Sequence, residues 1–391
     1  MADFRPIHPF PARMAPEIAI EAIAALPPGS MILDPMCGSG TVLRKSCELG
    51  FPCIGIDIDP LSVLHAQVWT SPLDRNAVKV ELSDVVLRAR ADKSNELPPY
   101  IDQDEETRAF VDFWFSRSQQ QQLSNLLRAM SCTENEALFR LALSRTIVTK
   151  NPKASLARDT AHSRPHKVLE DSEIDVIAAF ESGVDDMAKR LSANHLRGRC
   201  EVFGGDARAL TFLADGSIDA IITSPPYLNA IDYMRGHRLA LVWLGQHLSR
   251  LRTIRGDSVG AERGMEEART SPQMASFLAE VGWYAALSPR MKGVVRRYAH
   301  DVLLIAKEAA RVLKTSGTAT VVVGNSSVEG IFIPNSEIVS FAFRQYRLEA
   351  TDVAIRHIPE SKRYLPLANA KSTNSLSKRI RTESVTRFRR Q

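Results

Sequence analysis

The stretch Asp34-Pro35-Met36-Cys37-Gly38-Ser39-Gly40-Thr41 decides the fold of this chain. An apolar segment, 30–33, precedes it, and a segment of helical character, 42–49, follows it. Its two glycines therefore lie in a turn between a strand and a helix, where a doubly wound α/β sheet binds its cofactor. A second apolar segment, 53–56, ends at Asp57, 23 positions after the first residue of the stretch. A carboxylate at this spacing is typical of a ligand for ribose hydroxyls.

The glycine loop does not fit a dinucleotide. In the full Gly-x-Gly-x-x-Gly pattern a third glycine allows close packing beside a pyrophosphate, but here Leu43 occupies that position. A cofactor without a pyrophosphate, such as S-adenosylmethionine, is compatible with a bulky residue there. We therefore expect a nucleoside-containing cofactor of that kind.

A second motif, Thr223-Ser224-Pro225-Pro226-Tyr227, directly follows the apolar run 218–222. Two consecutive prolines cannot donate hydrogen bonds to a sheet, so they end the strand and leave their carbonyl groups as acceptors. A hydroxyl, rigid carbonyls and an aromatic ring at one sheet edge are suited to a flat base that carries an amino group. Taken alone, the motif is equally typical of an ordinary turn that terminates a strand.

With both motifs in place, the chain resembles the bacterial DNA methyltransferases of restriction-modification type that modify exocyclic amino groups, giving N4-methylcytosine or N6-methyladenine. The matching segments are roughly 5–75 and 200–245, with a looser match to about 365. The resemblance implies an α/β fold with a doubly wound, Rossmann-like class I methyltransferase sheet. It also implies S-adenosylmethionine as the cofactor and double-stranded DNA as the substrate.

The resemblance assigns roles to two sets of residues. It places one set at the cofactor: Phe10, Pro11, Asp34, Pro35, Gly38, Gly40, Thr41, Asp57 and Asp206. It places a second set at the reacting base: Ser224, Pro225, Pro226 and Tyr227. The Ser224 hydroxyl and the Pro225 carbonyl would accept the two amino hydrogens and aim the nitrogen at the methyl donor. Tyr227 would stack on a base that has been flipped out of the duplex.

The sequence leaves open which base would be methylated and whether the substrate is DNA or RNA. In the family, Ser at position 224 favours N4 of cytosine, and Asp or Asn there is commoner in enzymes that act on N6 of adenine. An RNA base N-methyltransferase would share the fold and a similar turn, although the sequence carries no recognisable RNA-binding appendage. A catalytically silent DNA-binding protein is the remaining alternative.

The positions of the five cysteines argue against methylation at C5 of cytosine and against a metal site. Methylation at C5 of cytosine needs a thiolate nucleophile, and none of Cys37, Cys47, Cys53, Cys132 and Cys200 ends the strand that bears the catalytic turn. None of them forms a Cys-x-x-Cys pair, so the sequence predicts no metal site and indicates buried structural thiols.

The spacing of the motifs predicts the domain organisation. Residues 1–75 and 200–365 form the predicted catalytic domain, interrupted by a mostly helical insertion, 76–199, that is a possible DNA-recognition module. The final segment, 366–391, holds seven basic residues against Glu383 alone. We therefore expect a disordered basic tail there, which could attract nucleic acid.

A basic stretch lies inside the predicted insertion. From 140 to 167 there are seven Lys or Arg residues and one acid, with hydroxyl side chains between them, a composition suited to phosphate contact. The candidate DNA-binding residues are Arg145, Lys150, Lys153, Arg158 and Arg164. A solvated basic loop is the alternative. A partner restriction endonuclease is possible for a protein of this kind.

Composition agrees with a globular enzyme. The chain has 391 residues, of which 44% are hydrophobic, enough for one large core with inserted modules. It has no apolar run approaching the length of a membrane span and no secretion signal, so we expect a cytoplasmic protein without a membrane partner. The net charge of +5 is modest, and its distribution matters more than its sum.

Overall fold

The computed structural model describes residues 6–10, 13–161, 165–192, 195–228, 232, 234–261, 270–358 and 382–391. The chain divides into two compact units. The first unit consists of Met1–Arg13, Asp59–Leu196 and Ile231–Arg255. The second unit consists of Met14–Ile58, Arg197–Ala230 and Gly256–Gln391. In the part of the chain that the structure describes, no helix is long and apolar enough to cross a membrane.

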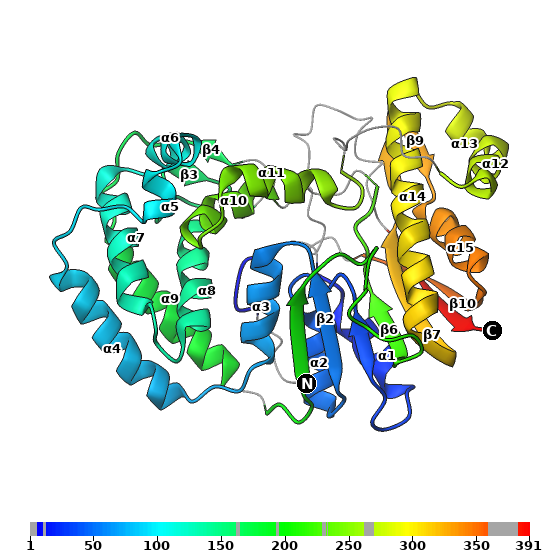
Figure 1. The fold of residues 1–391 in the computed structure, drawn as a ribbon, viewed down its shortest axis with the longest axis horizontal. Helices are drawn as coiled ribbons and strands as arrows, with labels where there is room; N and C mark the ends of the chain where they lie inside the picture. Colours follow the sequence, from blue (N-terminus) through cyan, green and yellow to red (C-terminus); the bar gives the residue numbers. More distant parts are fainter. Residues whose placement is uncertain are drawn as a thin grey trace. The chain divides into compact units, whose positions relative to one another are not determined.

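The second unit is built on a seven-stranded sheet with the order β10-β11-β7-β6-β1-β2-β5 (Figure 1). Its strands are β1 (Ile32–Asp34), β2 (Cys53–Asp57), β5 (Cys200–Gly204), β6 (Ile218–Thr223), β7 (Leu313–Gly324), β10 (Leu348–His357) and β11 (Thr382–Arg390). In the run β7-β6-β1-β2-β5, each strand pairs in parallel with the next. Strand β11 pairs antiparallel with both β7 and β10. The α/β fold predicted from the sequence is confirmed.

The strand order reverses between β1 and β6. From β1 the chain adds β2 and then β5 on one side, and it later returns to add β6 and β7 on the other side. In open α/β sheets, ligands bind in the crevice outside the carboxyl ends of the strands at such a reversal. The ends of β1, β2 and β6 are therefore the place to look for a site.

Helices cover both faces of this sheet. The side chains of Val321 and Val323 join a large core with α14 (Pro289–Val312) and α15 (Asn335–Gln345). Val322 points the other way and packs with Ile18 of α1 (Pro16–Ala24), next to α2 (Thr41–Leu49). This alternation is the two-residue period of a strand buried on both sides, as expected for a doubly wound sheet. Shorter elements complete the unit: α12 (Pro272–Glu280), α13 (Gly282–Ala285), β8 (Ser326–Val328) and β9 (Ile331–Ile333).

The end of the chain corrects one prediction. The expectation of a disordered tail over 366–391 is wrong for 382–391, because β11 occupies an interior position of the sheet. Phe388 is buried and stacks on Phe343, with ring centroids 4.6 Å apart, while Val385 is buried on the opposite face. Arg387 forms ion pairs with Glu21 and Asp352, so its charge is balanced within the fold. The rest of that predicted tail, 366–381, lies outside the described residues.

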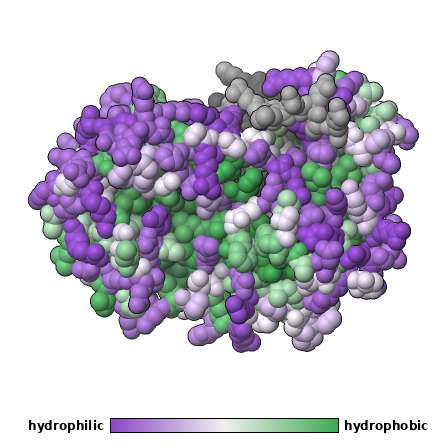
Figure 2. All heavy atoms as spheres, viewed as in Figure 1, coloured by the Kyte–Doolittle hydropathy of each residue, from purple (hydrophilic) through white to green (hydrophobic). Residues whose placement is uncertain are grey.

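The first unit is mostly helical, and the face of it that Figure 2 shows carries both hydrophilic and hydrophobic side chains. It contains α3 (Pro60–Thr70), α4 (Arg75–Ala91), α5 (Pro99–Asp102), α6 (Glu105–Trp114), α7 (Arg117–Met130), α8 (Glu136–Ile147), α9 (Val176–Leu191), α10 (Met234–Trp243) and the start of α11 (Leu248–Asp257), with the short hairpin of β3 (Ala157–Arg158) and β4 (His166–Lys167). Helix α4 packs against α7 and α9, and α8 packs against α9 and α3. The unit is thus larger than the predicted insertion 76–199, because α3, α10 and residues near the N-terminus pack within it.

Candidate functional site

The glycine loop is held in shape by the strand next to it. Gly38 and Gly40 adopt φ values of 49° and 80°, in the left-handed region that favours glycine. The backbone N–H of Gly38 donates a hydrogen bond of 2.8 Å to a carboxylate oxygen of Asp57 at the end of β2. Pro35 and Thr41 are buried on either side of the loop. Asp57 therefore fixes the loop that the sequence predicted to surround the cofactor.

Asp34 lies beneath this loop rather than on its surface. Its side chain is only 3% exposed, and one carboxylate oxygen accepts hydrogen bonds from the Thr223 hydroxyl (2.8 Å) and the Met36 backbone (3.3 Å). Burial raises the pKa of Asp34 to about 7, although these two hydrogen bonds act in the opposite direction. This acid thus supports the loop from inside the core.

The bond between Asp34 and Thr223 joins the two sequence motifs. The residues are 189 positions apart, and they stand at the ends of the adjacent parallel strands β1 and β6. The glycine loop, Asp57 and the Ser-Pro-Pro-Tyr turn consequently lie at the carboxyl ends of β1, β2 and β6. Thr223 was not among the predicted site residues, but its place as the first residue of the motif, directly after the predicted strand, was the signal for it.

Within the turn, the side chain of Ser224 is anchored on one side. Its hydroxyl donates a hydrogen bond of 3.0 Å to the carbonyl of Val322 in β7. Because the hydroxyl proton is donated to Val322, Ser224 Oγ can act only as a hydrogen-bond acceptor towards a ligand. Pro225 is buried, and Pro226 is partly exposed.

Tyr227 is partly buried and packs against the main core of the second unit. Burial raises the pKa of Tyr227 to about 12. The phenol is therefore neutral at physiological pH. Its backbone carbonyl also lies close to Gly260, where an added Cβ would stand 3.1 Å from that oxygen.

Asp206 lies just beyond β5, and its carboxylate is engaged by a residue that the sequence reasoning missed. The guanidinium of Arg208 holds both carboxylate oxygens, at 2.7 Å for the shortest contact. Arg208 also binds Asp301 of α14 at 2.6 Å, and burial raises the pKa of Asp301. A basic residue two positions after the predicted acid was the available signal. In this structure Asp206 is part of an ion-pair group.

Phe10, predicted to contact the cofactor, lies in the core of the first unit. Its side chain is 4% exposed, and its ring packs against the rings of His65 and His237, with centroids 5.8 and 5.1 Å away. His237 Nδ1 is 2.6 Å from a carboxylate oxygen of Asp59. Pro11 lies outside the described residues.

The predicted DNA-binding residues differ in whether an acidic side chain lies beside them. Arg145 forms an ion pair of 2.5 Å with Asp186, and Arg158 lies 3.2 Å from its neighbour Asp159. Lys150 and Lys153 are exposed. Arg164 lies outside the described residues. The two lysines are therefore the better candidates for contact with phosphate groups.

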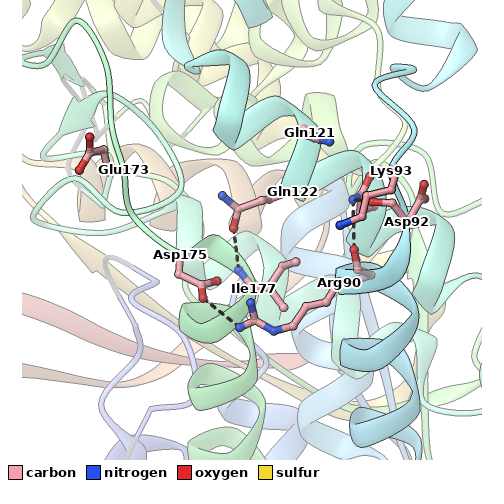
Figure 3. A pocket seen from close by; sticks show the side chains of 10 residues that line it. Arg90, Asp92, Lys93, Gln121, Gln122, Glu173, Asp175 and Ile177 are labelled. Atoms are coloured by element: carbon pink, nitrogen blue, oxygen red, sulfur yellow. Dashed lines mark hydrogen bonds and ion pairs between the residues drawn. The ribbon is translucent and has the colours of Figure 1, made fainter.

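A shallow polar pocket of about 360 Å³ lies in the first unit (Figure 3). Arg90 of α4 binds Asp175 at 2.9 Å across it, and Gln122 of α7 accepts hydrogen bonds from the backbone at Val176 and Ile177. These bonds fasten the start of α9 to α4 and α7. None of the residues that line the pocket belongs to the predicted site, and we assign it a structural role.

Comparisons with known proteins agree with the geometry. No protein-family model matches the chain. It is 24% identical over 424 aligned residues to the type II methyltransferase M.MvaI of Kocuria varians, an alignment that covers 97% of this chain and 88% of the relative. It is also 24% identical to the type II methyltransferase M.BsoBI of Geobacillus stearothermophilus, over 58% of this chain and 49% of the relative.

Among solved structures, a SAM-dependent methyltransferase from Methanosarcina mazei matches 97% of this chain and 99% of its own, with 9% identity and a TM-score of 0.35. That score is too low to add to the fold assignment, which rests on the strand order itself. The sequence relatives confirm the resemblance to methyltransferases of restriction-modification type, without separating N4-cytosine from N6-adenine specificity.

Proposed function

We propose that this chain, a relative of the type II methyltransferases, transfers a methyl group from S-adenosylmethionine to the exocyclic amino group of a flipped base in double-stranded DNA, with N4 of cytosine favoured over N6 of adenine. The observation that carries the proposal is the hydrogen bond of 2.8 Å between Asp34 and Thr223. It ties the loop suited to a nucleoside cofactor to the turn suited to an amino base, at the reversal point of the sheet.

The residues at this edge are suited to a nucleoside cofactor. A backbone loop with two left-handed glycines can approach a ligand closely, and the Asp57 carboxylate at the end of β2 is placed to accept hydrogen bonds from ribose hydroxyls. Bound there, S-adenosylmethionine would supply the activated methyl group. The same Asp57 carboxylate orders the loop through Gly38, so binding and loop shape depend on one residue.

The turn itself would prepare the nucleophile. The lone pair of an amino nitrogen on a base is delocalised into the ring, so the site has to hold that nitrogen in a more tetrahedral geometry. Ser224 Oγ and the Pro225 carbonyl can accept its two hydrogens, because the serine proton is already donated to Val322. With S-adenosylmethionine bound, a nitrogen held in this way would be aimed at the methyl carbon opposite the carbon–sulfur bond, and the proton that the nitrogen gives up after the transfer would leave to solvent.

Tyr227 would hold the base by stacking. The residue is partly exposed and packs against the core, and we expect the flipped base to stack on its ring. Flipping costs a few kcal/mol, which stacking and edge hydrogen bonds can offset. The neutral phenol suits this role, since no proton transfer by the tyrosine is required.

The first unit would contribute contact with the DNA backbone. Lys150 and Lys153 are exposed near the hairpin of β3 and β4, and lysines of this kind neutralise phosphate charge without reading sequence. We infer a recognition role for this helical unit.

The decisive experiment is nucleoside mass spectrometry after incubation with isotopically methyl-labelled S-adenosylmethionine, using mixed-sequence duplex DNA and, separately, structured RNA. We expect labelled N4-methylcytosine in DNA, and labelled N6-methyladenine would instead identify adenine as the target. Label in RNA alone, or no label despite intact cofactor binding, would refute the proposed function.

A matched variant separates catalysis from cofactor binding. We expect Tyr227→Ala to lower the rate of label incorporation by about 100-fold, because stacking on one base is worth about 1–3 kcal/mol and the base is also mispositioned. Its Kd for S-adenosylmethionine, measured by calorimetry, should stay within about threefold of wild type. Loss of cofactor binding in parallel would mean that the substitution had disturbed the core instead.

A further inference from the structure

Three cysteines that are distant in the sequence lie together in the second unit. Cys47 stands near the end of α2, Cys53 is the first residue of β2, and Cys200 is the first residue of β5. Their sulfur atoms all lie within 4.8 Å of one another, and Cys47 Sγ and Cys53 Sγ are 3.8 Å apart. We call these three residues the thiol cluster.

We propose that the thiol cluster binds one soft cation, of the chemistry of Cu(I) or Zn(II), through three thiolates. Thiolate sulfur selects such ions over hard cations, and three sulfurs at this spacing can converge on one centre. The site is separate from the proposed methyl-transfer site, because Cys53 and Cys200 pair at the amino ends of their strands. Asp57 lies at the other end of the five-residue strand β2, about 13 Å away at the usual rise per residue.

The backbone holds the cluster in place before any ion arrives. The N–H groups of Arg197 and Gly198 each donate a hydrogen bond of 2.8 Å to the carbonyl of Cys47. The N–H of Cys53 donates one of 2.9 Å to the carbonyl of Arg199. The segment 197–199 thus fastens α2 and β2 to the start of β5, so the three sulfurs are positioned by main-chain contacts.

Burial gives the cluster an inner and an outer side. Cys47 and Cys53 are 0% and 2% exposed, whereas Cys200 is partly exposed and offers a route for an ion to enter. Solvent on that side can supply a fourth ligand for zinc, which prefers tetrahedral geometry, while Cu(I) accepts three sulfurs alone.

Binding must be linked to proton release. A free cysteine is largely a protonated thiol at neutral pH, whereas the ligand of a metal ion is the thiolate. Because thiolates are the ligands, each bound ion displaces up to three protons, and affinity should fall steeply as the pH is lowered.

The test titrates the reduced, metal-free full chain with Cu(I) against a chromophoric chelator, and separately with Zn²⁺. We expect one equivalent bound, thiolate-to-metal absorption in the ultraviolet and proton release in weak buffer. Cys200→Ser should weaken binding by at least about tenfold, since it removes one ligand at a half-buried position. Cys132→Ser is the matched control, an exposed thiol in the first unit, and should bind like wild type.

The proposal has clear points of failure. No binding by the wild-type chain, or equal affinity in wild type and Cys200→Ser, would overturn it. If Cys200→Ser does not fold by circular dichroism, X-ray absorption on the loaded wild-type chain counts the sulfur ligands directly, and fewer than three would refute the site. A Cys47–Cys53 disulfide found by mass mapping in place of metal binding would identify the cluster as a redox pair instead.

Discussion

At the scale of single residues, Asp57 has two roles. It orders the glycine loop through Gly38, and it is the predicted ligand of the cofactor's ribose. Asp57→Asn keeps an amide oxygen that can accept from Gly38 but removes the negative charge. Hydrogen bonds to a charged group contribute about 1.5–3 kcal/mol, so we expect the Kd for S-adenosylmethionine to rise by about 10- to 100-fold. Isothermal calorimetry measures this directly.

The control for Asp57→Asn is Asp185→Asn, which removes an exposed carboxylate on α9 of the first unit. It should leave the Kd unchanged. If the two variants bound the cofactor equally well, Asp57 would not be the ribose ligand.

Asp34 makes stability depend on pH. Its pKa is raised to about 7 in the folded chain, so the folded state holds a proton that the unfolded state has lost, and the associated stability disappears as pH rises towards about 7. Asp34→Asn removes this linkage and keeps an oxygen acceptor for Thr223. Between about pH 5 and about pH 8, the free energy of unfolding of wild type should fall by about 3 kcal/mol relative to that of the variant.

Urea denaturation of both proteins across that range checks the sign as well as the size. Parallel pH profiles would show that Asp34 is ionised in the fold over the whole range. A steeper loss in Asp34→Asn than in wild type would contradict the buried environment that raises its pKa.

At the scale of elements, β11 shows how a basic segment becomes part of a core. Phe388 is fully buried against Phe343 of α15, so Phe388→Ala should lower the free energy of unfolding by about 3–5 kcal/mol. Arg389→Ala, at the exposed neighbouring position, is the control and should change it by less than about 0.5 kcal/mol. Thermal and urea unfolding provide the measurement, and a small effect of Phe388→Ala would mean that β11 adds little to the sheet.

At the scale of the whole molecule, binding to DNA depends on the distribution of charge and not on the net charge of +5. Removing both exposed lysines, Lys150→Ala with Lys153→Ala, should weaken binding to all sequences alike. It should also reduce the slope of log Kobs against log salt by about 2, one for each lost phosphate contact.

Fluorescence anisotropy on two unrelated duplexes at several salt concentrations tests this. Lys189→Ala, which removes one exposed charge on α9, is the control and should leave the slope unchanged. An unchanged slope in the double variant would place the DNA-binding surface elsewhere.

Local sequence patterns determined the parallel core of the fold. The strands that end at Asp34, Asp57 and Thr223 were all predicted, because short apolar runs bounded by glycine, proline or acidic residues specify buried strands without help from distant contacts. The mostly helical character of 76–199 was also predicted, and α7, α8 and α9 lie within that segment. Both motifs of the candidate site were readable because each is a short, continuous segment.

The tertiary structure decided what depends on contacts between distant segments. The basic composition of 382–391 predicts disorder, but the pairing of β11 with both β10 and β7 and the burial of Phe388 make it an interior strand of the sheet. The ion pair of Arg208 with Asp301 and the gathering of Cys47, Cys53 and Cys200 have no local signature, since the partners come from separate elements. The spacing of residues in the sequence determines local geometry only. The amino ends of β2 and β5 are brought side by side by the folded sheet.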